Sequence, residues 1–277
     1  MSNLSNTTAD IHIERPEYWT LELGLCRDKV QYMLYDVDQD NSLMVGSIAL
    51  DLSAGTYLKA LENAIYDNNV LLEEYKQVRV MVDSSQFVIL PPAYADEMTA
   101  QDAFDATYPD AKGDFAFCQL PRCNVGIAYA APQGVMSFLD RTFGMPTVVH
   151  HLYPLCEHYR RQDENREVAC LHLNLHTDYI DVLITRDRQL VMACSYAYKD
   201  INDAAYYALH AWQTFGLDQQ RDELLVTGDK QPRTQVIPVL RQYVSYVMPA
   251  IFPAAALKIG QDAVKAPLEL ILLALCV

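Results

Sequence analysis

The chain has 277 residues, with 21 lysines and arginines against 36 aspartates and glutamates, so its formal net charge is −15. Hydrophobic residues make up 51% of the sequence and charged residues 21%, a balance that excludes disordered and fibrous proteins. Phosphate contacts need clustered basic side chains, so the acidic balance argues against a nucleic-acid partner.

The sequence predicts a cytoplasmic protein. Its first ten residues, MSNLSNTTAD, lack the basic and apolar segments of a secretory signal. The longest apolar run, Leu270–Val277, is far shorter than the roughly 20 residues of a membrane helix. The seven cysteines are an odd number, and most lie in apolar stretches, which is typical of reduced thiols: Cys26, Cys118, Cys170 and Cys194.

Residues 21–34, LELGLCRDKVQYML, alternate apolar and polar side chains around a polar break, which predicts a β-hairpin. A third strand is expected at 42–50, followed by the polar residues Asp51-Leu52-Ser53, which are suited to N-capping. Apolar residues from Tyr57 to Leu72 then recur at helical spacing, and QVRVMVD at 77–83 predicts a fourth strand.

The next segment, 84–165, predicts a helix in ADEMTAQDAFDATYP and a hairpin formed by DFAFCQLP and NVGIAYAAP. QGVMSFLDRTFG predicts a helix ending at Gly144, and TVVHHLYPL predicts a strand. Residues 157–167 are mostly charged, which favours a linker between two domains.

Residues 171–184, LHLNLHTDYIDVLI, repeat the first hairpin at a constant offset of 150. A third strand at 189–197, a capping Asp200, a helix ending near Gly216 and a fourth strand at 222–229 follow in the same order. A helix from Val236 to Val247 and a strand or helix at 268–276 complete the chain.

We interpret the repeated order, strand–strand–strand–helix–strand, as an internal duplication, because chance is a poor explanation for a whole series of matched elements. The predicted fold class is mixed α/β, with a first domain at 10–160 and a second at 161–277.

This order of elements resembles the ribonuclease H-like fold, and two such domains in tandem resemble the actin-like ATPase superfamily. The chain is also similar to an uncharacterised bacterial family with this fold and no assigned activity, notably in APLELILLALC and LLVTGD. The superfamily resemblance implies ATP between the domains. It further implies that each first hairpin turn holds phosphate and magnesium through an Asp-x-Gly pattern, and that a glycine pair in the second domain contacts adenosine.

Carried over by residue, the resemblance selects five positions for nucleotide binding: Glu22, Gly24, Thr177, Gly228 and Asp229. The sequence departs from the superfamily pattern at Glu22 and at several neighbouring positions. Glu22 replaces the usual aspartate, and Leu25 follows Gly24 where a hydroxyl residue is usual. The second hairpin has His172 and Asn174 in place of the acid and the glycine, and Thr227-Gly228-Asp229 contains one glycine instead of two.

These departures argue against ATP binding and hydrolysis. Each hydrogen bond to a charged phosphate contributes about 1.5–3 kcal/mol, so losing most of them takes micromolar affinity beyond millimolar. We therefore expect no cofactor and no catalytic residue, with ATP and magnesium as the alternative.

No metal site is expected from the sequence. Histidines and a cysteine gather in two stretches, but their spacing matches no standard metal template, and ordinary partly buried side chains are favoured: His150, His151, Cys156, His158, His172 and His176. Asp83-Ser84-Ser85 is interpreted as a polar turn at a strand end.

Three hypotheses of function remain. The favoured one is a non-catalytic scaffold or interaction protein with a degenerate nucleotide cleft and a protein partner, which the 18 tyrosines support because tyrosine is enriched at interfaces. The alternatives are a divergent ATP-binding or phosphotransfer protein and a small-molecule-binding module. The oligomeric state stays open.

Overall fold

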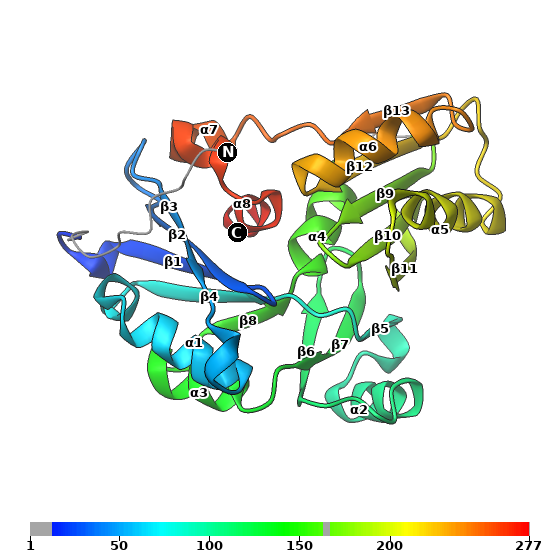
Figure 1. Cartoon of the computed structure of the whole chain (residues 1–277). Coiled ribbons are helices and arrows are strands. Elements are labelled where there is room, and N and C mark those ends of the chain that lie inside the picture. Colours follow the sequence, from blue (N-terminus) through cyan, green and yellow to red (C-terminus); the bar gives the residue numbers. More distant parts are fainter. Residues whose placement is uncertain (1–12, 163–166, 277) are drawn as a thin grey trace.

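The computed structural model describes residues 13–162 and 167–276 (Figure 1). Its first five-stranded sheet contains both strands of the first predicted hairpin at its centre. The strand order across this sheet is β3 (Met44–Ala49), β2 (Lys29–Asp36), β1 (Trp19–Leu25), β4 (Gln77–Val82) and β8 (Thr147–His150).

The second five-stranded sheet repeats that order. Its strands are β11 (Gln189–Ala197), β10 (Tyr179–Arg186), β9 (Cys170–Leu175), β12 (Glu223–Gly228) and β13 (Tyr246–Pro249). In each sheet the first three strands in chain order are antiparallel, and the last two run parallel to the first.

The two sheets also share one register. Gly24 lies opposite Gln31 in the first sheet, and Asn174 lies opposite Asp181 in the second, so both partners are displaced by 150 residues. This agreement supports the duplication and the predicted α/β fold class.

A three-stranded sheet follows β4 in the chain and packs against helix α2 (Glu97–Thr107). Its strand order is β5 (Phe87–Leu90), β7 (Val125–Ala131) and β6 (Asp114–Leu120). The hairpin predicted from DFAFCQLP and NVGIAYAAP is confirmed as β6 and β7.

Helices cover both large sheets (Figure 1). On the first, α1 (Tyr57–Tyr66) and α3 (Val135–Phe143) lie on the side opposite α8 (Leu268–Leu275). On the second sheet α5 (Ile201–Thr214) and α6 (Lys230–Leu240) contribute Trp212 and Val236 to the core, and α4 (Leu152–Gln162) packs against α8.

Local capping explains where two of these helices begin. Asp200 forms a capping box with Asp203 at the start of α5, as the sequence predicts for that position. Asp51 instead caps a short 3₁₀ helix at Leu52–Ala54, and the Thr56 hydroxyl accepts the Lys59 N–H at the start of α1. Further 3₁₀ turns lie at Pro16–Tyr18, Asn69–Leu72, Pro92–Tyr94 and Gln261–Lys265.

The C-terminal segment crosses from the second sheet to the first. Leu270, Leu272 and Leu273 of α8 belong to the main apolar core of the first sheet. Ile271 packs in a smaller cluster with Met33 of β2, and the short helix α7 (Ala256–Ile259) adds Ala256 to that cluster. Residues that follow the second copy in the chain therefore complete the packing of the first.

Three predicted elements were wrong in part. The strand predicted in TVVHHLYPL ends at His150, and α4 begins at Leu152, so part of the predicted 157–167 linker is helical and buries Tyr159 (residues 163–166 lie outside the described part). The helix predicted over Val236–Val247 ends at Leu240, because β13 pairs in parallel with β12 from Tyr246 onward.

The seven cysteines are free thiols, as the sequence predicts. Within the part of the chain that the structure describes, no helix combines the length and the apolar character needed to cross a membrane.

Candidate functional site between the two hairpin turns

Glu22 lies inside the first sheet and not at its turn. Its carboxylate is fully buried, forms an ion pair with Arg79 of β4, and accepts a hydrogen bond from the Tyr35 hydroxyl at 2.9 Å. Burial raises the pKa of Glu22 to about 7, and the Arg79 charge and the hydrogen bonds from Tyr35 and Arg79 oppose that rise. The surroundings of Glu22 are those of a buried structural ion pair.

The two candidate glycines have neighbours that explain them structurally. A Cβ on Gly24 would lie 3.5 Å from the Leu270 side chain, so α8 covers this position. Gly228 has φ +91°, and a Cβ there would lie 2.1 Å from the backbone oxygen of Leu175. Only glycine permits that close approach of β12 to β9.

Thr177 and Asp229 are exposed and lie at the same end of the second sheet. Thr177 lies in the turn after β9, and Asp229 follows β12, which is parallel to β9. The Asp229 N–H donates to the Leu175 oxygen at 3.0 Å, as the Asp83 N–H donates to the Leu25 oxygen at 3.0 Å in the first copy. Asp83 and Asp229 are therefore equivalent positions in the two copies.

The turns of the two hairpins contact each other. Arg27, in the turn after β1, forms an ion pair and a hydrogen bond with Asp178, in the turn after β9. These are the turns to which the superfamily resemblance assigns the phosphates. Here they are linked by their own side chains.

Beside this contact lies a group of four side chains that we call the His–Asp cluster: Asp83, His151, His176 and Asp181. One oxygen of Asp181 accepts from His151 Nε2 at 2.7 Å and from His176 Nε2 at 2.6 Å. Asp83 and His151 follow β4 and β8 of the first sheet, whereas His176 and Asp181 belong to the second hairpin. The cluster therefore joins the two halves.

The opposite charges of the cluster shift the pKa of two of its members. Burial alone would raise the pKa of Asp181, but the two imidazoles and their hydrogen bonds hold it well below its usual range. Burial alone would lower the pKa of His176, yet Asp181 and Asp83 together raise it to about 9. Asp181 is therefore a buried carboxylate that keeps a positive charge on His176 at neutral pH.

Neighbouring groups hold the rings of the cluster in place. The Tyr179 ring stacks on His176 with centroids 4.1 Å apart, and the Tyr198 hydroxyl donates to the His176 backbone oxygen at 2.8 Å. The Ser84 N–H donates to His151 Nδ1 at 3.3 Å, so the Nε2 of His151 carries the proton donated to Asp181.

Sequence reasoning missed this arrangement. His151 and His176 were considered only with histidines and cysteines close in sequence, and Asp83 was interpreted as a strand-end turn residue. A signal was present, because Asp83 and His151 each follow a strand of one parallel set, and such strand ends meet at one edge.

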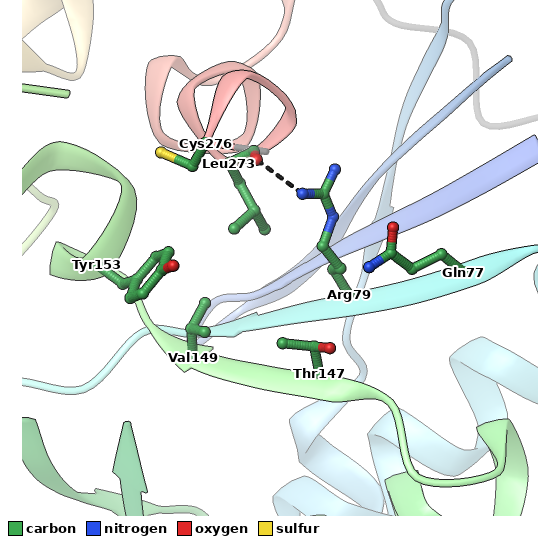
Figure 2. Close-up of a pocket in the computed structure, with 7 residues that line it drawn as sticks. All are labelled: Gln77, Arg79, Thr147, Val149, Tyr153, Leu273 and Cys276. Carbon is green, nitrogen blue, oxygen red and sulfur yellow. Dashed lines mark hydrogen bonds between the residues drawn. The ribbon is translucent and has the colours of Figure 1, made fainter. Parts of the chain in front are cut away.

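A separate cavity of about 210 Å³ lies between α8 and the β4–β8 edge of the first sheet (Figure 2). Its polar wall is Arg79, whose guanidinium donates to the Leu273 backbone oxygen at 3.0 Å and is already paired with Glu22. The lining residues are Gln77, Arg79, Thr147, Val149, Tyr153, Leu273 and Cys276. Ligand pockets typically enclose about 300–1,000 Å³, so this cavity suits at most a very small molecule.

The chain was compared with protein families and with solved structures. A family model described as "Protein of unknown function (DUF3822)" matches residues 8–247. A Bacteroides thetaiotaomicron protein, described as having an actin-like ATPase fold and unknown function, is 21% identical with a TM-score of 0.80. That similarity covers 93% of this chain and 96% of the other, and it shows the actin-like fold.

A second similar structure is the PilM–PilN type IV pilus biogenesis complex, at 14% identity and a TM-score of 0.51. It covers 95% of this chain and 98% of the matched one. No curated protein sequence matches the chain.

Proposed function

The chain belongs to the family described as "Protein of unknown function (DUF3822)", and from that premise we propose that it is a non-catalytic, actin-like interaction protein. Its two halves are joined by their own side chains at the place where the superfamily resemblance expects nucleotide. The observation that carries this proposal is the sharing of Asp181 by His151 and His176 beside the Arg27–Asp178 contact.

The charges at this place oppose a triphosphate. Carboxylates of Asp83, Asp178 and Asp181 lie there, and Arg27 and His176 are already paired with these three carboxylates. A phosphate group that took these cations would break those pairs and leave the carboxylates uncompensated beside its own negative charge, which costs free energy.

The test is a thermal-shift titration with millimolar Mg-ATP, Mg-ADP and ATP without magnesium. A ligand that binds the folded state at a hundred times its dissociation constant stabilises it by about 2.7 kcal/mol, so binding is readily visible. We expect no magnesium-dependent rise of the melting temperature.

Thr177→Ala and Asp229→Asn are the matched variants, because both residues are exposed and can be changed without disturbing the core. A magnesium-dependent rise in the wild type that disappears in these variants would overturn the proposal in favour of the ATP-binding alternative.

A protein partner is the second part of the proposal. Strand β13 is an edge strand of the second sheet and pairs with β12 alone among the described strands. Tyr246 is 50% exposed, Met248 37% and Ile251 81%. Apolar side chains beside a free strand edge are typical of interaction surfaces. The PilM–PilN structure, a protein complex by its description, adds support through its fold.

This part is tested with a photo-crosslinking residue introduced at Met248 and, as a control, at Met145, which is more exposed, at 82%. We expect a discrete covalent adduct with a cellular protein from position 248 and none from 145. Equal labelling at both positions, or none at 248, would argue against β13 as the partner surface.

A further inference from the structure

The Nδ1 atoms of two histidines face one carboxylate in the His–Asp cluster. His151 Nδ1 lies 3.7 Å from Asp83 Oδ1, and His176 Nδ1 lies 3.9 Å from Asp83 Oδ2. The metal-binding atoms of these three residues all lie within 4.8 Å of one another.

We propose that Asp83, His151 and His176 bind one first-row transition-metal ion, with Zn²⁺ the best-suited, and that this ion bridges the two halves of the chain. Asp83 and His151 come from the first sheet and His176 from the second hairpin. The inference stands apart from the proposed partner and from the nucleotide question, because it concerns a metal held by protein atoms alone.

The role of Asp181 is the main support for a metal site. Its Oδ2 accepts from the Nε2 atoms of both histidines, which leaves both Nδ1 atoms directed toward Asp83. Histidines that bind metals commonly donate their other ring N–H to a carboxylate, which fixes the tautomer and the ring orientation. Asp181 is fully buried and further fixed by the Ser195 hydroxyl, so it is a positioning residue for both rings.

An unsatisfied oxygen is the independent observation. Asp83 Oδ1 is buried and has no hydrogen-bond partner, although it faces His151 Nδ1. Buried carboxylate oxygens without a partner are costly, and a cation is one of the groups that satisfy them. The Asp83 side chain as a whole is 17% exposed and that of His176 18%, which gives an ion a route from solvent.

The donor set indicates which ions fit. Two imidazole nitrogens and one carboxylate oxygen suit Zn²⁺ and other first-row transition metals, whereas Mg²⁺ and Ca²⁺ prefer oxygen ligands throughout. Tetrahedral bonds of about 2.0–2.2 Å place neighbouring ligand atoms roughly 3.4 Å apart. The distances from Asp83 to the two Nδ1 atoms, 3.7 and 3.9 Å, are close to that value. The 4.8 Å limit for the whole set means that the two rings must also approach each other when the ion binds. The Ser84 N–H, 3.3 Å from His151 Nδ1, must release that nitrogen. His176, which is positively charged at neutral pH, must release its Nδ1 proton as the ion binds.

Metal binding is measured on the full chain after chelation and dialysis, with Zn²⁺ by calorimetry and Co²⁺ by visible absorption, in the absence of nucleotide. We expect one ion per chain, visible d–d bands of a four-coordinate nitrogen–oxygen site, and a metal-dependent rise in melting temperature. His176→Ala and Asp83→Asn should each lose the stoichiometric binding, and His210→Ala, at an exposed histidine, should retain it.

Asp181→Asn probes the positioning role, with an expected loss of about 10–100-fold in metal affinity. Circular dichroism checks that each variant is folded. If the variant at the buried Asp181 misfolds, the variants at the partly exposed Asp83 and His176 decide the outcome. Absence of stoichiometric binding, or equal binding by the wild type and the Asp83 and His176 variants, would show that the cluster is an ion-pair network only. A strong sulfur charge-transfer band with Co²⁺ would place the ion on cysteine and also overturn the proposal.

Discussion

The two copies of the duplicated unit share a backbone and differ in chemistry at matched positions. In the first copy the buried triad is Glu22, Tyr35 and Arg79. The equivalent positions in the second copy hold His172, Thr185 and Leu225, with a hydrogen-bond contact of 3.2 Å between His172 Nε2 and Thr185 Oγ1. One copy therefore buries an ion pair where the other buries an imidazole and a hydroxyl.

The hairpin turns differ in the same way. Cys26 Sγ contacts Gln31 Oε1 at 3.3 Å in the first copy, and His176 Nε2 contacts Asp181 Oδ2 at 2.6 Å at the equivalent positions of the second. Both contacts span the same place in the hairpin, and only the second is charged. The shared fold thus determines which positions are in contact, and the residues at those positions determine whether the contact is charged or neutral.

The largest expected effect comes from making the first copy resemble the second at Arg79. Arg79→Leu leaves the Glu22 carboxylate buried without its partner, which should lower the free energy of unfolding by about 3–5 kcal/mol at pH 8. Adding Glu22→Gln should restore about 2 kcal/mol, because it removes the unpaired charge. Urea unfolding measures both values, and equal stability of the single and double variants would contradict the pairing.

The raised pKa of Glu22, about 7, predicts that the stability of the protein depends on pH through this residue of the first copy. The folded state holds the Glu22 proton more tightly than the unfolded state. The contribution of this proton to the free energy of unfolding is therefore fully present below pH about 4.5 and is lost as the pH rises through about 7. The loss should approach about 3 kcal/mol.

Urea unfolding of the wild type and Glu22→Gln across this pH range isolates the contribution, since other groups cancel in the difference. The wild type should lose stability relative to the variant as pH rises. A difference that does not change with pH would refute this assignment.

Gly228 provides the reverse comparison, because Val82 occupies the equivalent register position of the first copy. Gly228→Ala should cost about 2–3 kcal/mol, since the new Cβ meets the Leu175 backbone at a left-handed φ. Gly216→Ala is the matched control: it is also left-handed but has open space around it, and should cost about 1 kcal/mol. Equal losses in thermal unfolding would mean that strain alone, and not the close approach, requires glycine at 228.

The smallest effect is expected at the contact between the turns. The Arg27 side chain is 80% exposed and that of Asp178 47%, so Asp178→Asn should change stability by about 0–1 kcal/mol, and high salt should abolish the difference. A loss well above this range in low-salt unfolding would contradict the assignment of this contact as a weak, solvent-exposed ion pair.

Much of the fold followed from the sequence because it depends on local periodicity. Alternation predicted both hairpins, and the constant offset between LELGL and LHLNL predicted the duplication. The actin-like fold was expected from the resemblance in the order of elements. The errors lay where tertiary pairing competes with local pattern. Tyr246–Pro249 forms a strand because β12 offers it a parallel partner, and no local signal marks that choice.

The site could be predicted less well, because its members are distant in sequence. The resemblance selected Glu22 and Gly24 from an Asp-x-Gly-like pattern, and the structure surrounds them with Arg79 and Leu270, which come from elsewhere in the chain. The sequence by itself determined the alternation, the duplication and the acidic balance, since these depend on the order of residues along the chain or on its total composition. Only the tertiary structure decided that Asp83, His151 and His176 meet, because parallel strand ends from two halves converge there.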